Sequence, residues 1–144
     1  METSSKIKIF LVDDDAFFLK LLEMQFLSHN HYETQTFSTG EYCIENLNVR
    51  PDFVILDFHL DSRDANAING LKTLDIIKEI SPETLVIMLS AQDKIEVAVD
   101  CMRHKASDYV VKSETSFFRI HKIIEAILKY QKIENQLNWY KDRL

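Results

Sequence analysis

The chain has 144 residues, of which 46% are hydrophobic and 28% charged, and its formal net charge is −6. This length fits one domain with its own core, and the composition excludes a fibrous or disordered chain. Two glycines are too few for glycine-rich phosphate loops, and the negative charge argues against direct nucleic acid binding.

The hydrophobic pattern predicts alternating strands and helices. Strands are expected where short apolar runs rich in β-branched residues occur, and helices where apolar residues recur every three or four positions. Five such strands alternating with helices imply a doubly wound α/β fold, a parallel sheet covered on both faces. The predicted strands are 6–12, 32–37, 53–57, 85–89 and 108–111, and the predicted helices are 16–28, 39–48, 71–80, 95–102 and 115–144.

Two predicted helices carry clear apolar faces. Leu71, Leu74, Ile77 and Ile80 recur at helical spacing in the third helix. The fourth helix has a single apolar stripe, which begins at Ile95 and continues at helical spacing through Ala98, Val99 and Met102.

The last predicted helix is too long for the domain. At 1.5 Å per residue it reaches about 45 Å, so part of it must project. Apolar residues recur along it at heptad spacing, which is typical of a coiled coil. We therefore expect a domain over 1–130 and a helical extension over 131–144, either a dimerising coiled coil or a linker to an output domain. The heptad residues are Ile123, Ala126, Tyr130, Ile133, Leu137, Tyr140 and Leu144.

Polar residues end four of the predicted strands. Asp13 and Asp14 follow the first, Asp57 ends the apolar run of the third, Ser90 follows the fourth, and Lys112 the fifth. The carboxyl ends of parallel strands share one edge of a sheet, where open α/β folds place their chemistry. Each residue alone is usually a turn former, a cap or a solvated charge, but together they indicate a site.

The clustered acids predict a magnesium site. Like charges at one edge repel each other, and a hard divalent cation relieves that repulsion with oxygen ligands. A carboxylate beside bound magnesium can attack a phosphoryl group and form an aspartyl phosphate. A lysine and a serine hydroxyl then serve the phosphoryl oxygens.

With these residues in place, the sequence resembles the receiver domains of two-component response regulators. The resemblance covers residues 6–130 and rests on the segments LVDDD, VILD, MLSA and DYVVK. It implies a flavodoxin-like five-stranded parallel sheet in the order 2-1-3-4-5. It also implies phosphoryl transfer from a histidine kinase or phosphotransfer protein, with Mg²⁺ as the cofactor.

The resemblance assigns roles by motif. It implies Asp57 as phosphoacceptor, Asp13, Asp14 and Asp57 as magnesium ligands, and the backbone carbonyl of His59 as a further ligand. Ser90, beside the small residue Ala91, is implied as switch hydroxyl, Tyr109 as switch aromatic and Lys112 as the conserved-type lysine of the family. His59 and Gln92, each two residues beyond a site residue, are expected to tune the lifetime of the phosphoaspartate.

Three departures from the family pattern affect the loops. Ser113 stands where the family usually has a proline in a cis peptide, and Lys105 stands where glycine is common. A lysine there is expected to adopt a left-handed cap. The loop from 59 to 69 is longer than usual. We interpret it as a polar surface insertion, and the alternative is a loop that shapes partner docking or magnesium access.

Two rival functions remain open. A haloacid dehalogenase-type phosphatase would use Asp13 as nucleophile and Asp15 as general acid, but this leaves Asp57 without a role. A receiver-like binding module would keep the fold without being phosphorylated.

Location and partners are further expectations. No apolar run approaches the length of about 20 residues that a membrane span needs, and Cys43 and Cys101 lie in predicted helices, typical of reduced thiols. We expect a cytoplasmic signalling domain that is no enzyme beyond its own phosphorylation and dephosphorylation. We expect no membrane or nucleic acid partner, and a homodimer through the last helix.

Overall fold

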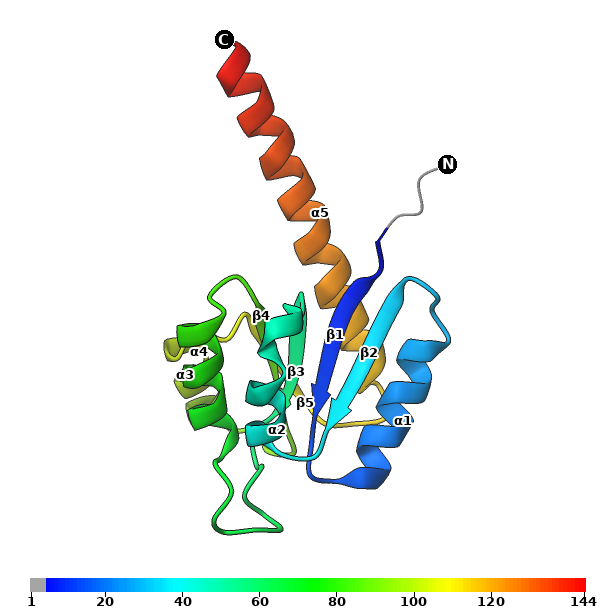
Figure 1. Ribbon diagram of the computed structural model, residues 1–144, viewed down its shortest axis with the longest axis vertical. Helices are drawn as coiled ribbons and strands as arrows, with labels where there is room; N and C mark the ends of the chain where they lie inside the picture. Colours follow the sequence, from blue (N-terminus) through cyan, green and yellow to red (C-terminus); the bar gives the residue numbers. More distant parts are fainter. Residues whose placement is uncertain (1–4) are drawn as a thin grey trace.

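The computed structural model describes residues 5–144 and contains one five-stranded parallel sheet in the order β2-β1-β3-β4-β5. The predicted fold and strand order are therefore confirmed. The sheet lies between two helical layers, and α5 projects far beyond it (Figure 1). The strands are β1 (Ile7–Val12), β2 (Tyr32–Phe37), β3 (Phe53–Asp57), β4 (Leu85–Ser90) and β5 (Asp108–Val111).

The helices begin and end near the predicted positions. The predicted second helix, 39–48, forms as two short elements, and the third strand ends at Asp57 as predicted. The helices are α1 (Ala16–Leu27), α2 (Gly40–Glu45), the 3₁₀ helix η1 (Leu47–Val49), α3 (Gly70–Ile80), α4 (Ile95–Arg103) and α5 (Ser116–Arg143).

Side-chain caps fix where three helices start. Asp15 accepts from the backbone N–H groups of Phe17 and Phe18, and Thr39 caps α2 in the same way. Asn69 caps α3 through the N–H of Lys72, 2.8 Å away. Such caps satisfy the free N–H groups at a helix start.

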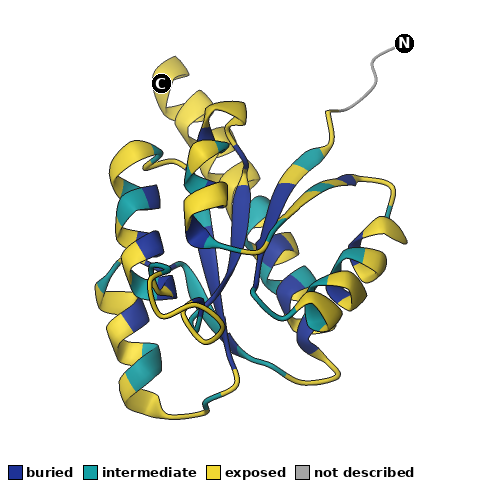
Figure 2. Ribbon diagram, turned by 60° about the horizontal axis from the view of Figure 1, so that its bottom comes forward, coloured by how far each residue is buried: buried dark blue, intermediate teal, exposed yellow. Residues whose placement is uncertain are grey.

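The central strands form the middle of the core. Every residue of β3 is buried, as a strand covered on both faces requires. One face packs against α2, α3 and α4 through residues such as Leu74 and Cys101, and the other against α1 and α5 through Phe26 and Ile120. Figure 2 shows the buried strands between helices whose outer sides are exposed.

The helical stripes differ from the sequence prediction. In α4 the buried residue is Cys101, whereas Ile95, Val99 and Met102 are 77%, 40% and 48% exposed. Ile80 at the end of α3 is also exposed. The stripe of α4 does not enter the core, because Val97 and Cys101 form the inward face.

The structure shows the backbone conformation at two loop positions that depart from the family pattern. Lys105 adopts a left-handed conformation, with φ 74°, as predicted, and the Lys112–Ser113 peptide bond is trans. Over the described residues, no helix has the length and apolar character that crossing a membrane requires.

Candidate functional site

Three carboxylates meet at the carboxyl edge of the sheet, as the strand pattern predicts. Asp13 and Asp14 follow β1, and Asp57 ends the neighbouring β3. One carboxylate oxygen from each lies within 4.8 Å of the others. Asp13 and Asp57 are each only 2% exposed, so water screens their repulsion poorly.

Lys112 is the cation that faces these acids. Its Nζ lies 2.7 Å from Oδ2 of Asp13 and 3.3 Å from Oδ1 of Asp57. The backbone N–H of Lys112 donates to the carbonyl of Ser90, 2.7 Å away, which holds the start of the loop against β4. The ammonium also lies 4.7 Å from the ring centre of Phe18, a cation–π contact.

Burial acts in opposite directions on the pKa values of Asp57 and Lys112. Burial raises the pKa of Asp57 to about 7, the charge of Asp13 adds to this, and Lys112 and the His59 N–H oppose it. Burial lowers the pKa of Lys112, but its hydrogen bond with Asp13 and the nearby acids outweigh this, so the pKa is raised. A single lysine therefore leaves the acid cluster short of positive charge.

The acid cluster fits a hard divalent cation. Oδ2 of Asp13 is buried, and the ammonium of Lys112, 2.7 Å away, is the positive charge beside it. One ammonium faces three carboxylates whose oxygens lie within 4.8 Å of one another. Carboxylate oxygens of this kind, completed by waters, are the usual ligands of Mg²⁺.

The long loop reaches this cluster through Ser62. Its hydroxyl donates to Oδ2 of Asp14 and lies 3.5 Å from the backbone carbonyl of His59. Both acceptors are groups for which the sequence predicted metal binding. Nothing in the spacing of Ser62 pointed to the site, because a flexible loop carries no periodicity that fixes its path.

Glycine brings α3 against the site. The N–H of Gly70 donates to the carbonyl of Phe58, 3.0 Å away. A Cβ at Gly70 would lie 2.2 Å from the carbonyl oxygen of Asp57, well inside contact distance. The start of α3 therefore packs on the backbone of Asp57 only with glycine at this position.

Ser90 and Tyr109 both bond to the backbone of Gln92. The buried hydroxyl of Ser90 accepts from the N–H of Gln92, 3.1 Å away. The hydroxyl of Tyr109 donates to the carbonyl of Gln92. The two predicted switch residues are therefore linked by one peptide segment at the end of β4.

His59 and Gln92 also meet. Their Nε2 atoms are 3.1 Å apart, and each residue is partly buried. The N–H of His59 lies 3.3 Å from Oδ1 of Asp57. The side-chain pair therefore joins the loop after β3 to the loop after β4, beside Asp57 and Ser90.

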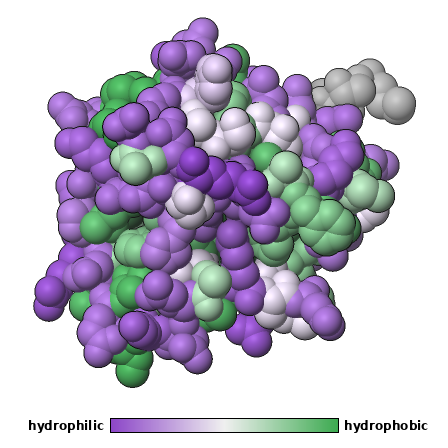
Figure 3. Space-filling view, turned by 90° about the horizontal axis from the view of Figure 1, so that it is seen from below, coloured by the Kyte–Doolittle hydropathy of each residue, from purple (hydrophilic) through white to green (hydrophobic). Residues whose placement is uncertain are grey.

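The surface around this edge is asymmetric. Seen from below, hydrophilic side chains cover the middle and hydrophobic ones gather on the α1 side (Figure 3). Phe17, Leu21 and Met24 of α1 are 75%, 46% and 57% exposed. Phe18 and Leu21 line a hollow that extends to Lys112.

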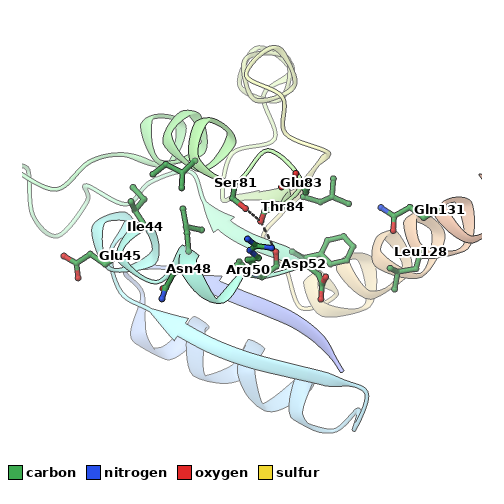
Figure 4. A pocket seen from close by; sticks show the side chains of 15 residues that line it. Ile44, Glu45, Asn48, Arg50, Asp52, Ser81, Glu83, Thr84, Leu128 and Gln131 are labelled. Atoms are coloured by element: carbon green, nitrogen blue, oxygen red, sulfur yellow. Dashed lines mark hydrogen bonds between the residues drawn. The ribbon is translucent and has the colours of Figure 1, made fainter. Parts of the chain in front are cut away.

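A second pocket lies at the opposite end of the strands (Figure 4). Two of its polar side chains form structural bonds: Thr84 Oγ1 donates to the carbonyl of Pro51, 2.9 Å away, and pairs with the hydroxyl of Ser81 at 2.7 Å. These bonds hold the start of β4 beside β3, which is a structural role.

Known proteins resemble the whole fold and its sequence. A family model described as response regulator receiver domain matches residues 9–127. The regulatory protein LuxO of Vibrio cholerae is 29% identical over 130 residues, covering 89% of this chain and 27% of LuxO. The chemotaxis protein CheY of Bacillus subtilis is 28% identical over 121 residues, covering 83% of this chain and 93% of CheY.

Solved structures agree. The BeF₃-activated DrrB receiver domain has a TM-score of 0.66 and 30% identity, covering 83% of this chain and 98% of that one. The signal receiver domain of a LuxO repressor protein from Vibrio parahaemolyticus has a TM-score of 0.76 at 24% identity, covering 92% and 97%. The second match shows the fold alone.

The chain spans about a quarter of LuxO and nearly all of CheY. The matched region includes all five strands and the acids, hydroxyl and lysine at their ends. The chain belongs to the response regulator receiver domain family.

Proposed function

We propose that Asp57 accepts a phosphoryl group from a histidine kinase or phosphotransfer protein, with Mg²⁺ as cofactor. The observation that carries this proposal is the cluster of Asp13, Asp14 and Asp57 facing one lysine, Lys112, at the sheet edge. A carboxylate nucleophile, an acidic cation site and a fixed ammonium are the parts that phosphoryl transfer needs.

The residues divide the work by position. One oxygen of Asp57 attacks the phosphorus in line while the bond to the donor nitrogen breaks. Asp13, Asp14, Asp57 and the carbonyl of His59 would hold Mg²⁺, which would supply positive charge to the phosphoryl oxygens. Lys112 supplies a second positive charge, and Ser90 donates a hydrogen bond to a phosphoryl oxygen.

Phosphorylation changes the surface through Gln92. A hydrogen bond from Ser90 to the phosphoryl group moves the hydroxyl that now accepts from the N–H of Gln92. The hydroxyl of Tyr109 donates to the carbonyl of Gln92, so the ring of Tyr109 moves when Gln92 moves. Helix α4 follows Gln92 in the chain, and its exposed stripe from Ile95 to Met102 offers apolar contacts to a partner.

The donor is expected to dock on α1. The exposed side chains Phe17, Leu21 and Met24 lie on the helix that starts beside Asp13 and Asp14. An apolar patch next to a charged site suits a helical phosphohistidine carrier, which buries the patch and brings its phosphorus to Asp57. The chain is then a cytoplasmic signalling domain rather than an enzyme acting on a separate substrate.

The extension of α5 is proposed to pair with a second copy. From Tyr130 onward the heptad residues are at least 46% exposed, including Leu137 at 56% and Tyr140 at 62%. One helix that exposes an apolar stripe over several turns is stabilised by a partner helix.

The first prediction concerns labelling of Asp57. Incubation with acetyl phosphate and Mg²⁺ should give a phosphoryl adduct by intact mass, and chelation of Mg²⁺ or Asp57→Asn should abolish it. Asp61→Asn, an exposed acid in the nearby loop, is the matched control and should label normally. An adduct that persists in Asp57→Asn would refute the assignment, and Mg²⁺ binding without any adduct would favour the unphosphorylated module. Turnover of a phosphate ester would instead favour the phosphatase.

The second prediction concerns stability and pH in Mg²⁺-free buffer. The pKa of Asp57 is about 7 in the folded protein against an ordinary 3.8, so the folded state binds the extra proton between these values. Stability should therefore fall as pH rises from about 4 to 7. Asp57→Asn removes this penalty and should raise the free energy of unfolding by about 1–4 kcal/mol at pH 8, with little gain near pH 4.

Urea denaturation followed by circular dichroism measures this difference. Asp61→Asn should change stability by less than about 0.5 kcal/mol at either pH. A gain for Asp57→Asn that is the same at pH 4.5 and pH 8 would contradict the raised pKa.

The third prediction concerns the lifetime of the phosphoaspartate. The contact between His59 and Gln92 restricts the approach of water beside Asp57. His59→Ala and Gln92→Ala should each speed dephosphorylation by roughly three-fold or more, since excluded water protects reactive intermediates. His104→Ala, a histidine bonded to Asp75 far from the site, should leave the rate unchanged. Rates within a factor of about two for both site variants would remove the idea.

The fourth prediction concerns self-association. Leu137→Lys places a charge in the apolar stripe and should weaken dimerisation by roughly ten-fold or more, because a buried leucine contributes about 1.5–3 kcal/mol. Asn135→Lys adds the same charge outside the stripe and should have little effect. Sedimentation velocity over a range of concentrations, with and without acetyl phosphate, measures both. A monomer mass at every concentration in both states would disprove the proposed pairing.

A further inference from the structure

Three histidines gather at the end of the sheet opposite Asp57. His29 and His31 lie in the segment between α1 and β2, and His121 lies in the second turn of α5. One ring nitrogen from each lies within 4.8 Å of the others. Figure 1 shows this segment at the upper end of β2, away from the loops that carry the acids.

Glu125 adds a fourth donor. It lies one helical turn after His121, and its Oε1 is 3.4 Å from Nε2 of His121. Two ligand atoms, each about 2.1 Å from a tetrahedral zinc ion, are about 3.4 Å apart. The spacing is therefore the edge of a tetrahedral site, and Glu125 is half-exposed, which leaves it free to adjust.

Tyr32 orients His121, the histidine that α5 contributes to the cluster. Its hydroxyl is 2.7 Å from Nδ1 of His121, and Tyr32 is only 3% exposed. When the phenol oxygen accepts the Nδ1–H, the lone pair of Nε2 faces Glu125. A ligating histidine in a metal site usually donates its other N–H to a fixed oxygen in this way.

Aromatic packing holds the ring of His121 in place. His121 stacks on Phe117 with ring centres 5.6 Å apart at 12°, and the ring centre of His29 lies 4.8 Å from that of His121. Metals bind the neutral form of an imidazole.

We propose that His29, His31 and His121, together with Glu125, bind a divalent transition-metal ion, for which Zn²⁺ is the best chemical match. Three imidazoles are borderline ligands that suit zinc over magnesium, and zinc also accepts a carboxylate oxygen as a fourth ligand. The acid cluster at the other edge, made only of oxygen donors, has the opposite preference. The bound ion links the segment before β2 to α5.

The test is a Zn²⁺ titration of tag-free protein, followed by NMR of the imidazole nitrogens. The chain has five histidines, so His59 and His104 are internal controls. We expect the ring signals of the three cluster histidines to shift with one Zn²⁺ per chain. The midpoint of thermal unfolding should rise by roughly 5–10 °C when free Zn²⁺ is about 100 times the dissociation constant.

Variants separate this site from other zinc binding. His31→Asn removes an exposed ligand and should fold normally while losing Zn²⁺ affinity at least ten-fold, and Glu125→Gln should also weaken binding. Tyr32→Phe should weaken it about ten-fold, as loss of an orienting partner does. His104→Asn is the matched control, and Asp13→Asn removes any zinc bound at the acid cluster. Both should keep the shifts of the cluster histidines.

Two outcomes would overturn the proposal. One is an affinity in His31→Asn and Glu125→Gln that stays within two-fold of the unsubstituted protein. The other is a set of Zn²⁺-induced shifts confined to His59 or lost in Asp13→Asn. In either case the histidines serve only as an aromatic cluster that packs α5 on the segment before β2.

Discussion

The structure depends on the meeting of buried carboxylates with one lysine at the sheet edge. Parallel pairing of β1 with β3 places Asp13 beside Asp57, and two like charges about 4 Å apart repel by about 4 kcal/mol at an effective dielectric constant of 20. Lys112 offsets part of this repulsion from the end of β5. The core, with β3 buried throughout, supplies the stability that this arrangement costs, so the domain retains an edge with excess negative charge, which suits the proposed binding of a cation.

Hydrogen bonds connect the same edge of the sheet to the segment before α4. Gln92 accepts from Tyr109 through its carbonyl and donates to Ser90 through its N–H. A shift of either side chain therefore moves a peptide that precedes α4. Because Ile95, Val99 and Met102 are exposed while Cys101 alone of that helix is buried, α4 has few core contacts resisting displacement. A weakly anchored helix is the element through which a small change at Ser90 can alter a partner surface.

The sequence predicted the strands and the acid edge for a physical reason. A strand covered on both faces is a continuous apolar run, and the residue that ends it must face the edge, so Asp57, Ser90 and Lys112 were recognisable. The buried faces of the helices were harder to predict. Spacing indicates an apolar stripe in α4 but not whether the stripe faces the core or a partner. For the same reason, spacing did not show that Ile80 and Met24 are exposed. Ser62 and the pairing of Tyr32 with His121, 89 residues apart, depend on how loops and helices pack, which periodicity does not encode.

The long helix α5 runs from the acid edge of the sheet, past the histidine cluster, into the exposed extension. It begins beside the acid edge, where Ser116 bonds to Ser113 next to Lys112. It crosses the sheet on Ile120 and Ile124, and His121 of the histidine cluster lies between these two residues. Its 28 residues extend about 42 Å, and the turns after Tyr130 touch solvent on all sides. The angle at which this extension leaves the domain is set by its first three turns. Under the proposed function the phosphoryl site acts at the start of those turns, and the proposed metal site acts through His121 and Glu125 in the second and third turns. Each is therefore placed to tilt the same helix, and a small rotation at its base moves the exposed heptad stripe by several times more at its tip.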